Sequence, residues 1–315
     1  MKNKKIMGFS ILLLSILFVV AGCGNKQETA KTDKLQVVTT FYPMYDFTKN
    51  VVGDNGEVSV LMKAGTEPHD YEPSAKDIAK IADSDVFVYN SEEMETWVGS
   101  VLKNIDTKKT VVIDASKEIK LLEGSHEEED EDHDHDHEGH SHAHDPHVWL
   151  DPVLAKEEVN AIKEGLIQAD KTNKASYEKN AKTYSDKLDA LNEKFEAGLK
   201  DAKNRTFVTQ HAAFAYLAAR YDLKQVAISG ISPDQEPSPA KLAELNDFVK
   251  ENNIKVIYFE ETASPKIAKT LAKETGATLA VLSPIEGITK EDQDQGIDYI
   301  KVMENNLKAL QETIK

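Results

Sequence analysis

Residues 174–203 read KASYEKNAKTYSDKLDALNEKFEAGLKDAK, a stretch without proline that contains a single glycine, Gly198. Its larger apolar residues recur at steps of three and four, which predicts a helix with one apolar face. These residues are Tyr177, Ala181, Tyr184, Leu188, Leu191 and Phe195. A helix of about 30 residues spans roughly 45 Å, enough to connect two lobes stiffly, although an exposed coiled-coil arm is an alternative. We expect this linking helix to occupy residues 171–204.

On both sides of this stretch, short apolar runs alternate with helical patterns. Strands are expected at 35–41, 58–62, 86–89 and 110–113, and again at 205–209, 255–259 and 277–282. Such alternation is typical of parallel sheets covered by helices. A final helical stretch is expected from about 293 to 313. We therefore predict an α/β fold with two lobes, 35–170 and 205–315, each built on a parallel central sheet and joined by the long helix.

The N-terminus has the pattern of an export signal. Three lysines precede an apolar run, Ile11–Val20, which is too short to span a membrane as a helix. The small residues Ala21-Gly22 then precede Cys23, the only cysteine of the chain. This pattern predicts a signal peptide over 1–22 and resembles a bacterial lipobox, with Cys23 as the lipidation site. An uncleaved N-terminal anchor is the alternative.

From these features we expect an extracytoplasmic protein that a lipid anchor holds at the cell membrane, with residues 23–34 as a flexible tether. The anchor and the Lys-rich composition favour a Gram-positive surface. The chain of 315 residues has a net charge of −17, which argues against a nucleic-acid partner.

Seven of the 10 histidines lie in one acidic segment, Ser125–Asp145, which contains no Lys or Arg. They are His126, His133, His135, His137, His140, His142 and His144. A tract without large apolar residues cannot form a core, so we expect 125–144 to be disordered. Imidazoles at this density predict additional weak Zn²⁺ sites that collect metal beside a tight site. A solubilising insertion with incidental metal affinity is the alternative.

The other three histidines, His69, His147 and His211, lie far apart in sequence and each near the end of an expected element. Taken alone, any one of them is as compatible with a hydrogen-bonded structural role as with a role as a metal ligand. Three of them in similar loops, beside a His-rich tract, predict one defined metal site. Neutral imidazole suits zinc, copper and nickel, and three imidazoles leave one position of a tetrahedral zinc site.

Three motifs around these histidines resemble a known family. Glu67–Pro73 reads EPHDYEP, Asp145–Pro152 reads DPHVWLDP and Thr209–Tyr216 reads TQHAAFAY. They are similar to motifs of the zinc-binding solute-binding proteins of ABC transporters, the cluster A-I zinc/manganese receptors (ZnuA/AdcA-like), and the resemblance runs from about residue 35 to the C-terminus.

This resemblance implies a metal held in the cleft between two lobes, with His69, His147 and His211 as ligands. It also implies Glu286 as the fourth ligand, with water as the alternative. The implied partners are an ABC permease and its ATPase, and we expect a monomer. Manganese receptors of the family have a carboxylate at the position of His211, so three imidazoles favour Zn²⁺. A manganese receptor stays an alternative.

Two other functions compete with a zinc receptor. A secreted zinc-dependent hydrolase would need an open coordination position and a base. The sequence has no HExxH motif, and Glu67 is the only tempting base. A surface adhesin is permitted by the lipid anchor, but the sequence has no visible repeat. We therefore expect a protein that is not an enzyme.

Four further residues near the predicted ligands have two interpretations each. Glu260 and Glu261 follow an expected strand and are candidates for hydrogen bonds to a metal-bound imidazole. Trp149 and Phe214 are candidates for shielding the site from water. A solvated loop for the two glutamates, and a plain core position for the two aromatic residues, are the alternatives.

Overall fold

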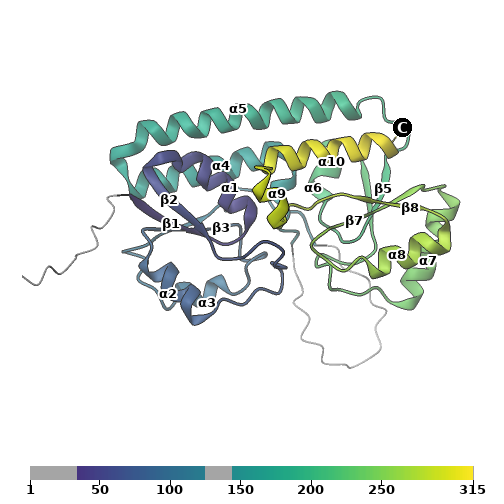
Figure 1. The fold of residues 1–315 in the computed structure, drawn as a ribbon, viewed down its shortest axis with the longest axis horizontal. Helices are drawn as coiled ribbons and strands as arrows, with labels where there is room; N and C mark the ends of the chain where they lie inside the picture. Colours follow the sequence, from purple (N-terminus) through teal and green to yellow (C-terminus); the bar gives the residue numbers. More distant parts are fainter. Residues whose placement is uncertain (1–33, 125–143, 315) are drawn as a thin grey trace, which may run out of the picture. The chain divides into compact units, whose positions relative to one another are not determined.

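The computed structural model describes residues 34–124 and 144–314. These residues contain two parallel β-sheets with helices packed on them (Figure 1). The first sheet has the strand order β2-β1-β3-β4 and the second has the order β6-β5-β7-β8, and every strand pair is parallel. The strands are β1 (Leu35–Thr39), β2 (Gly56–Val60), β3 (Val86–Tyr89), β4 (Val111–Asp114), β5 (Thr206–Thr209), β6 (Lys224–Ala227), β7 (Val256–Phe259) and β8 (Thr278–Val281). The predicted α/β fold with two parallel sheets is confirmed.

The helices pack on these sheets and on one another. They are α1 (Tyr42–Val52), α2 (Ala75–Asp83), α3 (Val98–Leu102), α4 (Pro152–Ala169), α5 (Lys174–Leu199), α6 (Ala215–Arg220), α7 (Pro239–Glu251), α8 (Lys266–Thr275), α9 (Lys290–Asp294) and α10 (Tyr299–Thr313), with 3-10 turns η1 (Gly53–Asn55), η2 (Val148–Leu150) and η3 (Lys171–Asn173). Alternate residues of a strand point to opposite faces. Val37 and Val88 accordingly contact the larger core, whereas Phe87 packs in a separate cluster with Ile81 and Val98.

Helix α5 contains the apolar face that the sequence predicts. All six residues of that face are buried. The helix contacts α1 and α4 of the first half and α10 of the second (Figure 1). A 3-10 turn, η3, precedes it, so α5 itself is shorter than the predicted linker of 171–204. The lobe boundaries at 170 and 205 stay predictions, because residues 34–315 form one compact unit.

Side chains cap the N-termini of α2, α4 and α7. Ser74 and Asp77 form a reciprocal capping box at α2. Asp151 accepts a hydrogen bond from the backbone N–H of Val153 at the start of α4. Ser238 caps α7, in which Pro239 is the first residue. These side chains satisfy backbone donors that a helix start leaves free.

Two details of the second half differ from the prediction. The expected helix from about 293 to 313 is two helices, α9 and α10, separated at Gly296, which has a φ of 71° that favours glycine. The edge strand β6 was not predicted. Its sequence, Lys224-Gln-Val-Ala, has an exposed lysine and no fully buried residue, so it lacks the apolar run that identifies interior strands.

Several predictions lie outside the described residues. They concern the signal peptide 1–22, Cys23 with the tether as far as residue 33, and the histidines at 126, 133, 135, 137, 140 and 142. His144 is described, and it forms an isolated antiparallel bridge with Glu123. The expectation of disorder was therefore wrong for residue 144. Across 34–124 and 144–314, no helix combines the length and apolar character that a membrane crossing requires.

Candidate metal centre

His69 lies in the loop between β2 and α2. Gly65, with a φ of 76°, allows the tight turn that precedes it. The Glu67 carboxylate accepts a hydrogen bond from the backbone N–H of His69 at 3.1 Å. This local contact holds the loop so that the imidazole points inward, and the residue is only 6% exposed.

His147 directly precedes η2. Its neighbour two residues back, Asp145, accepts two hydrogen bonds at Oδ1, from the backbone N–H of His147 at 2.9 Å and from its Nδ1–H at 2.7 Å. Because the carboxylate accepts from Nδ1–H, the lone pair of the ring is at Nε2. A single short turn therefore sets both the position and the tautomer of this imidazole. The ring of Trp149 lies beside it, with ring centroids 5.1 Å apart.

His211 follows β5 by two residues. Its carbonyl oxygen accepts hydrogen bonds from Thr209 Oγ1 at 2.8 Å and from Gln225 Nε2 at 2.9 Å. Its Nδ1–H donates to Glu260 Oε1 at 2.7 Å, and Glu260 follows β7, the strand that pairs with β5. One of the two predicted hydrogen-bonding glutamates therefore contacts a site imidazole, whereas Glu261 is exposed.

Glu286 lies in the loop after β8. The preceding residue, Ile285, has a φ of 59°, a strained backbone conformation for a β-branched residue. The carbonyl oxygen of Pro284 accepts a hydrogen bond from Trp149 Nε1 at 2.7 Å. The indole thus ties this loop to the turn that carries His147. Trp149 and Phe214 are both fully buried core residues.

The four predicted side chains converge on one point. The Nε2 atoms of His69, His147 and His211 lie 3.2, 3.0 and 3.2 Å from Glu286 Oε1. One ligand atom from each residue lies within 4.8 Å of all the others, and all four residues are buried. Donors bound at 2.0–2.1 Å to a tetrahedral zinc ion lie roughly 3.3 Å apart. The spacing therefore fits a four-coordinate ion with three nitrogen donors and one oxygen donor.

The charges at this centre favour a bound cation. Burial opposes ionisation of Glu286, but the imidazoles of His211 and His69 hold the pKa of its carboxyl well below the usual range. Burial lowers the pKa of His69 to about 4. Burial acts in the same direction on His147 and His211, but their carboxylate neighbours, Asp145 and Glu260 together with Glu286, raise both pKa values above the ordinary value. Protons thus compete with a metal ion for two of the three imidazoles.

Glu67, the candidate base, has a shifted pKa in the metal-free protein. Burial and then the charge of Glu286 raise the pKa of its carboxyl to about 9. Without a metal ion at the centre, a carboxyl with this pKa keeps its proton near neutral pH.

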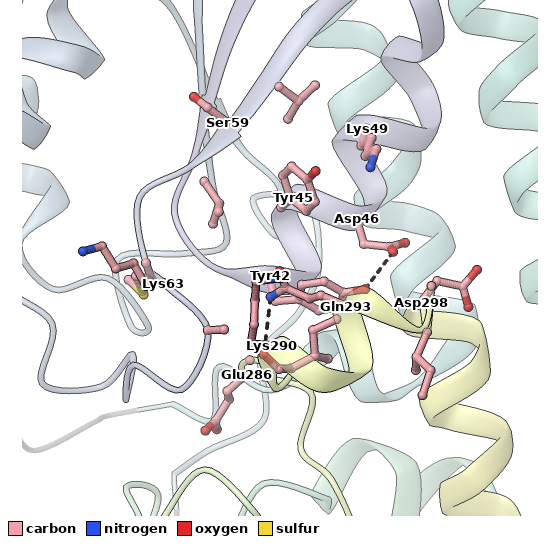
Figure 2. A pocket seen from close by; sticks show the side chains of 18 residues that line it. Tyr42, Tyr45, Asp46, Lys49, Ser59, Lys63, Glu286, Lys290, Gln293 and Asp298 are labelled. Atoms are coloured by element: carbon pink, nitrogen blue, oxygen red, sulfur yellow. Dashed lines mark hydrogen bonds between the residues drawn. The ribbon is translucent and has the colours of Figure 1, made fainter.

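A cavity of about 840 Å³ adjoins the centre, and Glu286 is one of the residues that line it. Figure 2 shows it between Tyr42 and Asp46 of α1 on one side and Lys290 and Gln293 of α9 on the other. The Tyr42 hydroxyl donates to Asp46 Oδ2 at 3.2 Å across its wall (Figure 2). Space next to the buried Glu286 gives its loop room to move.

Among the other predicted site residues, His144 is described, and it does not join the centre. His144 is exposed, and its Nδ1 lies 3.1 Å from Glu93 Oε1. The remaining six histidines of the tract and Cys23 lie outside the described residues. Asp145 was not predicted to orient a histidine, although its position two residues before His147 is a readable signal for such a contact.

Comparisons with known proteins identify relatives that are named for zinc uptake or zinc binding. The family described as "Zinc-uptake complex component A periplasmic" (ZnuA) matches residues 37–313. The high-affinity zinc uptake system protein ZnuA of Bacillus subtilis (strain 168) is 53% identical over 315 residues, which cover 99% of this chain and 98% of that protein. The zinc-binding lipoprotein AdcA of Streptococcus pneumoniae serotype 4 is 54% identical over 306 residues. This chain corresponds to only 60% of that longer protein.

The fold has solved counterparts as well. The Zn(II)-bound ZnuA-like domain of Streptococcus pneumoniae AdcA superposes with a TM-score of 0.76 at 51% sequence identity. The superposition covers 89% of this chain and 99% of that domain. The family match across nearly all of the described residues, together with these identities, assigns the chain: it belongs to the zinc-uptake complex component A (ZnuA) family.

Proposed function

We propose that this protein is a zinc-binding receptor that captures Zn²⁺ outside the cytoplasm and delivers it to an ABC permease for uptake. The observation that carries the proposal is the buried convergence of three imidazole Nε2 atoms on one carboxylate oxygen at 3.0–3.2 Å. His69, His147, His211 and Glu286 are the proposed ligands. The names of the relatives, a zinc uptake protein and a zinc-binding lipoprotein, support the same ion.

The donor set supports zinc over manganese. Mn²⁺ prefers oxygen donors and higher coordination numbers, whereas three imidazoles with one carboxylate suit Zn²⁺. Copper and nickel rank with zinc by affinity alone. Discrimination against them has to come from geometry, and a closed tetrahedral cage disfavours the tetragonal arrangement that Cu²⁺ prefers.

The same geometry supports a receptor over a hydrolase. A catalytic zinc keeps one position open for water, whereas a site with four protein ligands is closed. Glu286 is the proposed fourth ligand, so the proposed site has no open position. We therefore propose a protein without catalytic activity.

The test is zinc titration with a competing chelator, combined with metal analysis of the purified protein. We expect one tight zinc per chain, and the loss of tight binding when alanine replaces His69, His147, His211 or Glu286 in turn. His144→Ala is the matched control, since this histidine is exposed and pairs with Glu93. Tight binding that survives two of the four ligand substitutions would refute this site.

Anchoring and the acidic tract complete the proposal. Cys23→Ala should release the protein from membranes in a cell that processes lipoproteins. Deletion of residues 125–143 should remove weak zinc ions and leave the tight one. If the tight zinc disappears with the tract, the tract is part of the primary site and the proposed division of labour is wrong.

Release requires movement, because the four ligands are buried. We propose the loop that carries His69 as the moving element, because Lys63 and Ala64 of this loop line the 840 Å³ cavity. Hydrogen exchange should show this loop less protected in zinc-free protein than in zinc-bound protein. Equal protection in the two states would point to another element.

A further inference from the structure

One hydroxyl, that of Tyr216, contacts both ends of the chain segment that carries the histidine-rich tract. It donates to the carbonyl oxygen of Asp145 at 2.7 Å and accepts from the backbone N–H of Leu122 at 2.8 Å. Leu122 and Asp145 also bond directly, with the Asp145 N–H donating to the Leu122 carbonyl at 2.9 Å. We call these two residues the neck of segment 123–144. Tyr216 belongs to α6 in the second half of the chain, so a side chain from that half closes the neck.

The neck is one step from the metal centre. Asp145 receives Tyr216 at its carbonyl oxygen, and its side chain holds both the backbone N–H and the Nδ1–H of His147. The Nε2 atom of that imidazole lies 3.0 Å from Glu286 Oε1. An unbroken series of short contacts therefore runs from Leu122 through Tyr216 and Asp145 to a proposed zinc ligand.

The surroundings of Tyr216 make these hydrogen bonds effective. The residue is 4% exposed, and it packs with Ile119 and Val148 in a small apolar cluster. Burial raises the pKa of its hydroxyl, so the group stays protonated and can donate. Hydrogen bonds shielded from water are expensive to leave unmade. The Tyr216 ring thus fixes the hydroxyl in place, and the hydroxyl fixes the neck.

We propose that Tyr216 is a positioning residue for zinc binding that couples the neck of the histidine-rich segment to the ligand His147. Closing the neck orients Asp145 and so strengthens zinc binding, and bound zinc in turn keeps the neck closed. The proposal rests on the proposed zinc site. Such coupling is reciprocal, because each event must favour the other by the same factor.

The first test is Tyr216→Phe in the full-length protein, which removes the hydroxyl and keeps the ring. We expect zinc to dissociate on the order of tenfold faster, as for loss of other groups that orient metal ligands. The d–d absorption bands of the Co²⁺-loaded protein should also shift, because the imidazole changes its orientation. Tyr221→Phe is the matched control, since its hydroxyl bonds Asn192 instead of the neck.

Each outcome of this test decides something. If Tyr216→Phe lowers thermal stability but leaves the dissociation rate and the Co²⁺ spectrum at wild-type values, the role is structural and the inference is wrong. If Tyr221→Phe changes both readouts equally, the effect is not specific to the neck and the inference is also wrong. If wild-type protein binds no tight zinc, the proposed function fails first.

A second test uses only wild-type protein and therefore does not depend on a variant that folds. Reciprocity requires that zinc slow the hydrogen exchange of the Leu122 amide, which donates to the Tyr216 hydroxyl. We expect a slowing on the order of tenfold, the factor in metal affinity that is lost with a group that orients a metal ligand. An exchange rate that zinc leaves unchanged would overturn the coupling, even if zinc binds tightly at the four proposed ligands.

Discussion

The two sheets have equivalent strand orders, but the side chains at the ends of their two central strands make different kinds of contact. In each sheet the order reverses between two central strands, β1 and β3 in the first and β5 and β7 in the second, and ligands of α/β proteins bind outside such a point. In the second sheet this point holds His211 with Glu260. In the first sheet Glu95 fills it, accepting hydrogen bonds from Thr40 Oγ1 and from the backbone N–H groups of Asn90 and Ser91.

The difference shows that topology supplies a location and side chains decide its use. Both points hold a buried carboxylate. Among the described residues, the hydrogen-bond partners of Glu95 all lie in its own half. Asn90 extends this network to the buried Glu158 at 2.9 Å. Glu260 orients an imidazole whose other nitrogen faces the metal centre. We therefore expect substitutions at the first point to change stability alone, and substitutions at the second to change zinc binding.

The largest expected effect is that of His211→Ala. Zinc at about 1,000 times its Kd stabilises wild-type protein by about 4 kcal/mol, and the variant should lose most of this gain. Thermal unfolding with and without zinc measures it. Glu95→Gln is the control and should keep the zinc-dependent rise in Tm. If the zinc-dependent rise in Tm persists in His211→Ala, the second sheet's point does not bind zinc and so does not differ in this respect from the point that holds Glu95.

The next effect concerns Glu95 and pH. Burial raises the pKa of this carboxyl to about 7, above the value of 4.5 for the free side chain. The folded protein thus holds the proton more strongly. The resulting stabilisation is complete below pH 4.5 and is lost as pH rises through 7. The free energy of unfolding of Glu95→Gln, relative to wild type, should therefore rise by about 3 kcal/mol between pH 4 and pH 8.

Denaturant unfolding of zinc-free protein at several pH values tests this prediction. A difference between the two proteins that is constant over this range would show that folding does not raise the pKa of Glu95. Zinc affinity of Glu95→Gln at pH 7 should equal that of wild type, which separates this network from the metal centre.

Glu260→Gln should have an intermediate effect on zinc binding. The glutamine oxygen can still accept from His211 Nδ1–H, but it lacks the charge that makes the imidazole a better donor. Substitution of a residue that hydrogen-bonds a metal ligand typically costs about 10- to 100-fold in metal affinity. Competition titration with a chelator measures the change. An unchanged Kd would mean that the negative charge of Glu260 does not strengthen zinc binding, because the glutamine oxygen can still accept from His211 Nδ1–H.

The smallest effect is expected for Glu261→Gln, which is the matched control for Glu260→Gln. Glu261 is exposed, and surface substitutions away from special contacts usually change stability by less than about 0.5 kcal/mol. Zinc affinity should stay within about twofold of wild type. An effect equal to that of Glu260→Gln would show that the general negative charge of this loop, and no particular contact, supports zinc binding.

Much of the proposed centre could be read from local motifs. His69, His147 and His211 stand in short loops at element ends, and the structure brings all three together with Glu286. Of the carboxylates that orient the imidazoles, Asp145 is two residues from its partner, whereas Glu260 is 49 residues from His211. The sequence could name Glu260 as a candidate but could not separate it from Glu261. Strand pairing decides between them, because it sets which of the two faces the site.

Tyr216 and β6 show where sequence reasoning fails. The residues that Tyr216 contacts lie 94 and 71 positions away, and no local pattern identifies a hydroxyl that joins them. Strand β6 lies at a sheet edge with a partly polar sequence, so its apolar pattern is weak. In both cases the information lies in contacts between segments that are distant in the chain.

By itself, the sequence determined the alternation of strands and helices, the apolar face of α5 and the residues able to bind a metal, because periodicity and donor chemistry are local properties. Only the tertiary structure decided that four side chains from separate loops reach one oxygen atom. It also decided which of two adjacent glutamates contacts an imidazole, and that one tyrosine hydroxyl closes the neck beside a proposed ligand. Distances between loops depend on how both sheets pack against the shared helices, and no stretch of sequence contains that packing.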